Sequence, residues 1–144
     1  ALVLGGGIAG AAAAAALAQR GWAVILLEQG SENRITALRP QEAFARLEKE
    51  VPGAKFFLFS NDPDWTREHF KGENRILVEG STEDTGYLDL YLMSKCKHNI
   101  IANSSFSWWG AWLNDNPEKK VTAPARWLNG RECRDIYTER MIRI

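Results

Sequence analysis

A short polar elbow in the second half of the chain carries side chains that could bind an anion. Asn103, Ser104 and Ser105 follow the apolar run at 98–102 and precede a tryptophan-rich stretch at 106–112 that has the spacing of a helix. An apolar run of this length is typical of a buried parallel strand. In an open α/β sheet, ligands bind where strands end and helices begin, and the free N–H groups of a helix N-terminus suit a phosphate. The sequence therefore predicts an anion site at this elbow.

A glycine-rich stretch near the start of the chain has the spacing of a pyrophosphate loop. Gly5, Gly7 and Gly10 lie in a G-x-G-x-x-G frame between a short apolar run and an alanine-rich helix, and Glu28 follows the next apolar run. The glycines would permit a tight turn and a close approach to a pyrophosphate, and the acid would bind ribose hydroxyls. The pattern predicts a βαβ unit, which is either a dinucleotide site or only a scaffold.

Apolar runs and helical stripes alternate along the whole chain. The expected strands lie near 2–4, 23–27, 55–59, 75–78, 98–102 and 120–123. Between them the spacing predicts helices, one beginning near Pro40 and another capped by Asp62. This alternation favours the α/β class and a single doubly wound Rossmann-like domain over residues 1–144. We expect about six mostly parallel strands with helices on both faces.

Composition and charge restrict the class of protein. Lys and Arg balance Asp and Glu at 18 each among 144 residues, and no basic run exceeds two residues, which argues against a nucleic-acid surface. Cys96 and Cys133 have no metal-ligand spacing and suggest no disulfide framework, so we expect no metal and a reducing, cytoplasmic location. Residues 1–18 lack charges, but their glycine and alanine content predicts strand, loop and helix rather than a membrane span.

Two longer motifs resemble one known family. DLYLMSKCKHNIIANSSFSWWGAWLN at 89–114 is similar to the C-terminal signature of the α-1,2-fucosyltransferases, which transfer fucose from GDP-fucose to a galactose hydroxyl. FFLFSNDPDW at 56–65 resembles a second segment of that family, with Asn61 in place of an acid. The likeness covers about 35–144. It implies the C-terminal part of the nucleotide-sugar-binding half of a glycosyltransferase.

The resemblance assigns expected roles to a few residues. It implies that the ligand is GDP-fucose or another nucleotide and that Asp89 contacts its guanine base. It also implies that the elbow approaches the β-phosphate, through Asn103, Ser104, Ser105 and Phe106. Asp62 matches an acid associated with activity. Each has a structural alternative: Asp89 as a solvated helix residue, the serines as helix caps, and Asp62 as an N-cap. The family's acceptor is a galactose-containing glycan, and this interpretation requires no cofactor.

The chain departs from the fucosyltransferase pattern at its start. The family's His-x-Arg-Arg-x-Asp motif, which grips the donor's diphosphate, does not occur. Residues 1–30 occupy that place, and they resemble the N-terminus of FAD-dependent oxidoreductases. In the alternative interpretation, in which the chain is a dinucleotide-binding module, this resemblance implies FAD as the cofactor. The chain is therefore interpreted as a hybrid. Without a basic group to neutralise the leaving diphosphate, we expect transfer to be weak or absent. A chimeric scaffold without activity is the third hypothesis.

Large aromatic and histidine side chains allow both structural and binding roles. Trp108, Trp109 and Trp112 have helical spacing and are expected to pack in the core or on the sheet, with sugar stacking as the alternative. His98 begins an apolar run and is expected to be structural. His69, on a charged helix face, is expected to be solvated.

Overall fold

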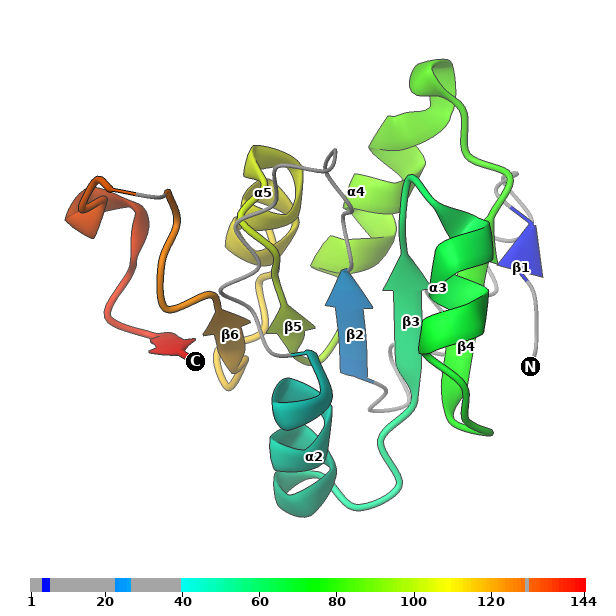
Figure 1. Cartoon of the computed structure of the whole chain (residues 1–144), viewed down its shortest axis with the longest axis horizontal. Coiled ribbons are helices and arrows are strands. Elements are labelled where there is room, and N and C mark those ends of the chain that lie inside the picture. The colour runs from blue at the N-terminus through cyan, green and yellow to red at the C-terminus, as the bar shows by residue number, and fades with distance from the viewer. Residues whose placement is uncertain (1–3, 6–22, 27–39, 129) are drawn as a thin grey trace.

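The computed structural model of the chain has a parallel sheet at its centre (Figure 1). It describes residues 4–5, 23–26, 40–128 and 130–144. The strands in these ranges are β1 (Leu4–Gly5), β2 (Ala23–Leu26), β3 (Phe56–Phe59), β4 (Arg75–Glu79), β5 (Asn99–Ile100), β6 (Val121–Ala123) and β7 (Met141–Arg143). They form one sheet in the order β1-β4-β3-β2-β5-β6-β7, and every described pairing is parallel. The predicted α/β class is confirmed.

Strands β2 to β7 follow the doubly wound strand order, with β2 in the first position. The chain runs outward from β2 through β3 to β4, then returns to the other side of β2 at β5. Strand β1 is added at the far edge, where Leu4 and Gly5 pair with Val78 and Glu79 of β4. The predicted βαβ unit would place β1 beside β2, but β4 and β3 lie between these two described strands.

Strand β7 was not predicted. All six expected strands occur, and β7 adds a seventh at Met141–Arg143. Its residues pair with Val121–Ala123, and the Ala125 N–H donates to the Ile144 carbonyl at 2.7 Å. The strand has only three residues, and none of them is fully buried. Such a short edge strand produces no apolar period that sequence reasoning could detect.

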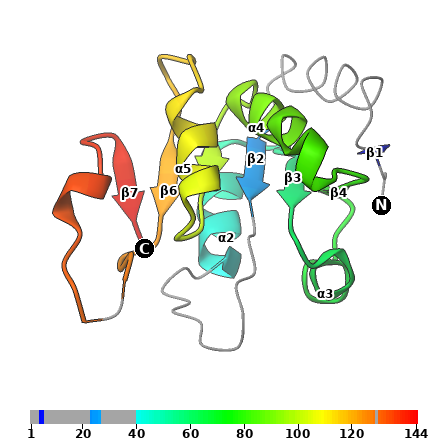
Figure 2. The same cartoon turned by 90° about the horizontal axis from the view of Figure 1, so that it is seen from above.

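Helices cover both faces of the sheet, as predicted (Figure 2). They are α2 (Pro40–Glu50), α3 (Pro63–His69), α4 (Gly86–Ser94) and α5 (Ser105–Trp112), with 3-10 turns at Glu83–Thr85 and Arg134–Ile136. Helices α2 and α3 lie on one face, and α4 and α5 lie on the other. No helix in the described ranges is long and apolar enough to cross a membrane.

Strand β3 supplies the centre of the core on both faces. Its four residues are all buried. Because successive side chains of a strand point to opposite faces, Phe56 and Leu58 pack with the cluster under α2, whereas Phe57 and Phe59 pack with the cluster under α4. The ring of Phe44 from α2 meets Phe56 edge-on, with centroids 5.2 Å apart. An unbroken apolar run is what a strand buried on both faces requires.

Helices α4 and α5 approach each other closely at one glycine. A Cβ added to Gly110 would lie 2.7 Å from Sδ and 2.8 Å from Cβ of Met93 on α4. Glycine therefore sets the distance between these two helices. Both helices begin at the carboxyl ends of the strands. The contact between Gly110 and Met93 therefore also affects how far apart the first turns of α4 and α5 lie.

The tryptophans of α5 do not all pack as predicted. Trp108 is half-buried and donates its Nε1–H to the Ile136 carbonyl at 2.8 Å. Trp109 and Trp112 are 50% and 54% exposed, so the core prediction is wrong for these two side chains. The buried face of α5 is made instead of small residues at helical spacing, Ser107, Gly110 and Ala111. The close approach of α4 leaves no room there for an indole ring.

Candidate functional site

A cavity of about 260 Å³ opens at the carboxyl ends of β3 and β4. It is lined by Phe59, Ser60, Asn61, Ser81, Thr82, Gly86, Asp89, Met93 and Phe106. The lining therefore combines the end of β3 and the loops after two strands with the first turns of α4 and α5 and with Met93 in the last turn of α4. This is the position at which open α/β sheets bind ligands.

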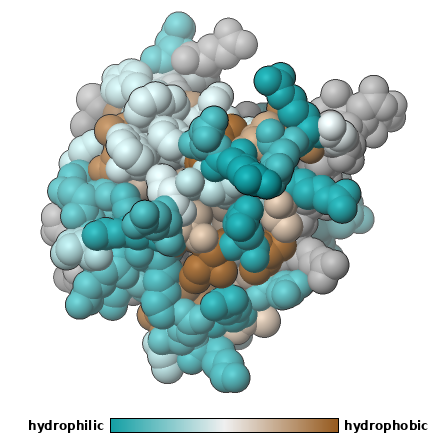
Figure 3. Space-filling view, turned by 90° about the vertical axis from the view of Figure 1, so that its left-hand side faces the viewer, coloured by the Kyte–Doolittle hydropathy of each residue, from teal (hydrophilic) through white to brown (hydrophobic). Residues whose placement is uncertain are grey.

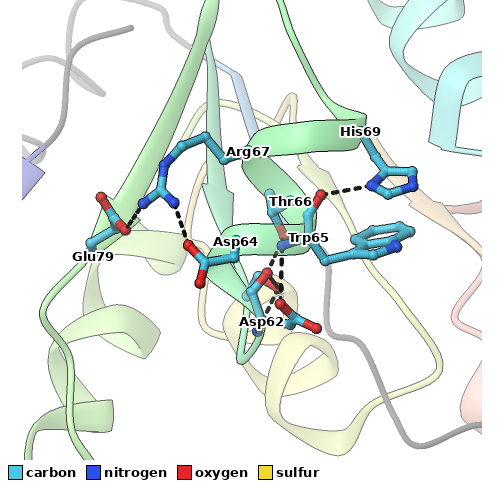
Figure 4. Close-up of polar contacts among 8 residues, drawn as sticks. Asp62, Asp64, Trp65, Thr66, Arg67, His69 and Glu79 are labelled. Atoms are coloured by element: carbon cyan, nitrogen blue, oxygen red, sulfur yellow. Dashed lines mark hydrogen bonds and ion pairs between the residues drawn. The ribbon is translucent and has the colours of Figure 1, made fainter.

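The loop after β3 is held by the cap of α3 (Figure 4). Asp62 accepts the Trp65 N–H on Oδ1 at 3.0 Å, and its carbonyl accepts the Thr66 hydroxyl at 2.9 Å. Ser60 Oγ accepts the Asp62 N–H at 3.0 Å. The N-cap prediction for Asp62 is thus confirmed. Its carboxylate does not line the cavity, whereas the neighbouring Asn61 does.

An arginine close to this loop is already occupied by carboxylates. Arg67 binds Asp64 at 2.5 Å and also pairs with Glu79 at the end of β4 (Figure 4). The bridge joins α3 to β4, although such exposed pairs contribute less than about 1 kcal/mol each. Arg67 is not part of the cavity lining. Among the described residues that line the cavity there is no lysine or arginine, and Asp89 is the only ionisable one.

Asp89 is held in place within the cavity. It lies in the first turn of α4, is half-buried, and accepts the Ser81 hydroxyl on Oδ1 at 2.6 Å. Burial raises the pKa of this carboxyl, and the hydrogen bond from Ser81 opposes that change. A partly desolvated carboxylate with an unused oxygen face can accept hydrogen bonds from N–H groups of a ligand. The alternative of a freely solvated helix residue is wrong.

The elbow after β5 lies beside the cavity. Ser104 is the N-cap of α5, and its Oγ accepts the Phe106 N–H at 3.2 Å, so the capping alternative holds for this serine. Asn103 and Ser105 are exposed. Phe106 lines the cavity, whereas the other three residues do not. The structure therefore brings Asp89 and Phe106 together, and leaves the remaining elbow residues accessible at the next strand end.

Residues 40–139 match the family described as glycosyl transferase family 11. The chain belongs to this family. It is 42% identical over 91 residues to an O-antigen biosynthesis glycosyltransferase, WbnK, from Escherichia coli, a match that covers 62% of the chain and 30% of that protein. It is 38% identical over 105 residues to an α-1,2-colitosyltransferase from Escherichia coli, covering 68% of the chain and 35% of the relative. The chain thus spans about a third of the length of these relatives.

The N-terminal part matches a second family. Residues 3–67 match the NAD(P)-binding Rossmann-like domain, and this match overlaps the glycosyl transferase match at 40–67. These two matches confirm the hybrid interpretation. No solved structure matches the chain significantly.

The dinucleotide-like loop is described only in part. Gly5 ends β1, whereas Gly7, Gly10 and Glu28 lie outside the described residues. In the dinucleotide fingerprint, the acid follows the strand next to the one that leads into the glycine loop. Here β1 and β2 are three strand spacings apart, about 14 Å at ~4.8 Å each. In the dinucleotide fingerprint these two strands are adjacent, whereas β1 and β2 of this chain are not.

Several lining residues were missed by sequence reasoning. Ser81, Thr82 and Gly86 follow β4, and the Thr82 N–H donates to Thr85 Oγ1 at 2.7 Å, which shapes the turn into α4. The rule that ligands bind where strands end, which led to the elbow after β5, applies equally to the loop after β4. The contact between Ser81 and Asp89 spans eight residues and has no sequence signal.

The histidines are not part of the cavity in this family member. His98 is buried, and its Nδ1 accepts the Lys120 N–H at 3.1 Å. Burial lowers its pKa, so the ring is neutral at physiological pH and structural, as predicted. His69 is exposed and stacks on Trp65 with centroids 4.2 Å apart. Within the described residues, no group of three or more His, Cys, Asp or Glu side chains could hold a metal ion.

Proposed function

We propose that this chain is the donor-nucleotide-binding part of an α-1,2-fucosyltransferase-like glycosyltransferase. The donor would be GDP-fucose or a related nucleotide sugar, and the acceptor a galactose-containing glycan. Membership of glycosyl transferase family 11 supports this proposal, as does a relative named for α-1,2 transfer of colitose. The observation that carries it is the cavity in which Asp89 and Phe106 meet at the carboxyl ends of the strands.

The proposed binding mode assigns a role to each wall of the cavity. Asp89 accepts hydrogen bonds from the N–H groups of the guanine edge, and Ser81 holds the carboxylate in position. Phe106 and Met93 provide an apolar wall for the base. The elbow at Ser104 and Ser105 presents the N-terminus of α5 to the β-phosphate. No cofactor enters this mode.

The same geometry supports the expectation of weak or absent transfer. The first-position strand β2 reads Ala-Val-Ile-Leu, so it offers no cation where the family carries its basic motif. Departure of GDP requires its diphosphate charge to be neutralised in the transition state. The lining described here supplies no lysine or arginine. Binding without efficient turnover is therefore the expected behaviour, and Asp62 remains an untested candidate for a catalytic acid or base.

Calorimetric titration with GDP and GDP-fucose tests the proposal. Asp89→Asn is expected to weaken GDP binding about tenfold, because a charged hydrogen bond to the base contributes about 1.5 kcal/mol or more. Asp115→Asn removes an exposed carboxylate outside the cavity and should leave the affinity unchanged. Absence of heat at millimolar GDP would refute donor binding, and equal affinities of the two variants would refute this site.

A second function, dinucleotide binding, is favoured by the match of residues 3–67. It would use Gly5, Gly7 and Gly10 for a pyrophosphate and Glu28 for a ribose, with FAD or NAD as the ligand. A flavin absorbance spectrum of the purified protein and titration with both dinucleotides decide this hypothesis. If the protein is colourless and neither ligand raises its melting temperature, dinucleotide binding is excluded. If GDP does not bind either, the chimeric scaffold without activity is favoured.

A further inference from the structure

A second cavity, of about 380 Å³, lies at the other end of the sheet. It is formed by the segment that follows β6 together with β7, and it shares no lining residue with the cavity at Asp89. Figure 3 shows this end of the molecule, where hydrophilic side chains surround a small apolar patch. Among the lining residues are four arginines and one carboxylate: Arg126, Arg131, Arg134, Arg143 and Glu132.

The walls of this arginine cavity are fixed by contacts with the core. Trp127 is buried, and the ring of Tyr137 meets it edge-on with centroids 6.4 Å apart. The Tyr137 hydroxyl donates to the Pro124 carbonyl at 2.9 Å. Leu128 and Arg131 form an antiparallel bridge, and Gly130 adopts a φ of 68° between them. These contacts hold the backbone that carries the arginines, so a ligand need not order it.

The positive charge of this cavity is only partly compensated. Arg134 pairs with Glu132 at 2.6 Å, and Arg143 lies over the Tyr137 ring at 5.1 Å from its centroid. Arg126 and Arg131 form no ion pair within the part of the chain that the structure describes. Arg126, Arg131 and Arg134 are exposed, so water and salt weaken their mutual repulsion, and an anion in the cavity would offset what remains. Guanidinium groups bind phosphate oxygens in a bidentate manner, which favours a phosphate over a simple halide as the anion.

We propose that the arginine cavity is a binding site for a phosphate-bearing ligand. The shared chemistry is a phosphate or diphosphate group held between Arg126 and Arg131, whether it belongs to a soluble molecule or to a lipid headgroup. This site goes beyond the proposed donor site and does not depend on it. Failure of GDP binding at Asp89 would leave this proposal intact.

Cys133 lines the same cavity and provides a local reporter. The other cysteine, Cys96, is buried, and burial raises the pKa of its thiol well above the usual value, so it reacts slowly. The rate of alkylation by iodoacetamide in the folded protein therefore reports on Cys133. Inorganic pyrophosphate at ten times its dissociation constant should slow this rate about tenfold, because about one tenth of the cavity is then free.

Matched controls distinguish binding of pyrophosphate in the cavity from a general effect of ionic strength on the alkylation rate. Sodium chloride at the same ionic strength should have little effect on the alkylation rate. The double variant Arg126→Gln/Arg131→Gln should lose the protection, whereas Arg46→Gln, which removes an exposed arginine of α2, should keep it. Melting temperatures and unprotected rates establish that each variant is folded. Equal slowing by sodium chloride, or full protection of the double variant, would overturn the proposal.

Vesicles distinguish the two sources of phosphate. Phosphatidylglycerol vesicles and phosphatidylcholine vesicles are compared with free pyrophosphate in the same assay. Protection by pyrophosphate supports a soluble ligand, and protection by phosphatidylglycerol alone supports a lipid phosphate. Absence of protection by pyrophosphate and by both vesicles would refute the site.

Discussion

The two cavities of this protein divide between them what a nucleotide-sugar enzyme needs in one place. The cavity at β3 and β4 has a carboxylate, hydroxyls and aromatic rings, but none of the described residues that line it is cationic. The cavity beyond β6 has four arginines and a single carboxylate. The first is suited to the hydrogen-bonding edge of a base, and the second to phosphate. Their separation is consistent with the proposal that the chain binds a nucleotide but transfers sugar weakly or not at all.

The two cavities also differ in what fixes them. The cavity at Asp89, which we propose as the donor site and call the donor cavity, depends on helix packing. Gly110 and Met93 set the distance between α4 and α5. The arginine cavity depends on a loop pinned by Trp127 and Tyr137. A change in the packing of α4 against α5 should therefore act directly on the first cavity, and reach the second only through Trp108 of α5, which donates to the Ile136 carbonyl.

The largest expected effect comes from Gly110→Ala. The added Cβ would lie 2.7 Å from Met93 Sδ and 2.8 Å from its Cβ, so the helices must move apart. Overpacking of this kind costs about 1–3 kcal/mol in the free energy of unfolding. GDP affinity should fall as well, because Met93 lines the cavity at Asp89. Protection of Cys133 by pyrophosphate should fall less, because a shift of α5 reaches that cavity only through the contact of Trp108 with Ile136. Urea denaturation measures the first effect, and calorimetry the second.

Gly86→Ala is the matched control for this substitution. Gly86 also lies on α4, but its added Cβ would meet Phe106 at an ordinary 3.9 Å. Its effect on unfolding should be within about 0.5 kcal/mol. If the two variants were equally stable, Gly110 would not set the distance between the helices.

A smaller effect is expected from placing a cation in the donor cavity. Thr82 is exposed and lines the cavity. Thr82→Arg should tighten GDP binding about threefold to tenfold, since a charged hydrogen bond to phosphate contributes about 1 kcal/mol or more at an exposed position. Thr82→Gln provides a side chain of similar reach without the charge. Equal affinity of both variants would show that missing charge is not what limits binding.

Much of the fold was predictable because its signals are local. The apolar run at 56–59 and the cap at Asp62 correspond to β3 and the start of α3 within a residue. The order of the strands, the pairing of β1 with β4, and β7 depend on contacts distant in sequence. The exposure of Trp109 and Trp112 depends on how closely α4 approaches, which no helical period reveals.

The sequence predicted part of the cavity at Asp89 but not the arginine cavity. Asp89 and Phe106 came from the motif resemblance, and the structure places both in one cavity. The contact of Ser81 with Asp89 depends on the turn between β4 and α4. Three arginines of the second cavity lie within 126–134 but form no basic run, and Arg143 joins them only when β7 pairs with β6. Clusters that form through tertiary pairing are invisible to a search for basic runs.

Ser81→Ala tests the electrostatics of the donor cavity through pH. Burial raises the pKa of Asp89 and the Ser81 hydrogen bond lowers it, so removing the hydroxyl raises the pKa further. The carboxylate is the form that accepts hydrogen bonds, and GDP binding is therefore lost as pH falls through this pKa. In Ser81→Ala the loss should occur at higher pH. Titrations over the acid range measure the shift, and an unmoved profile would show that Asp89 does not bind the ligand as a carboxylate.

The smallest expected effect concerns the arginine cavity. Glu132 holds Arg134 in an ion pair whose side chains are 68% and 78% exposed. Glu132→Gln removes the only carboxylate among the described lining residues and frees Arg134. Pyrophosphate should therefore bind about twofold to threefold more tightly, in line with the small energies of exposed pairs. Glu139→Gln, outside the cavity, is the charge-matched control. The concentration of pyrophosphate that halves the alkylation rate of Cys133 measures the change. A weaker response in Glu132→Gln would mean that the pair orients Arg134 for the phosphate rather than competing with it.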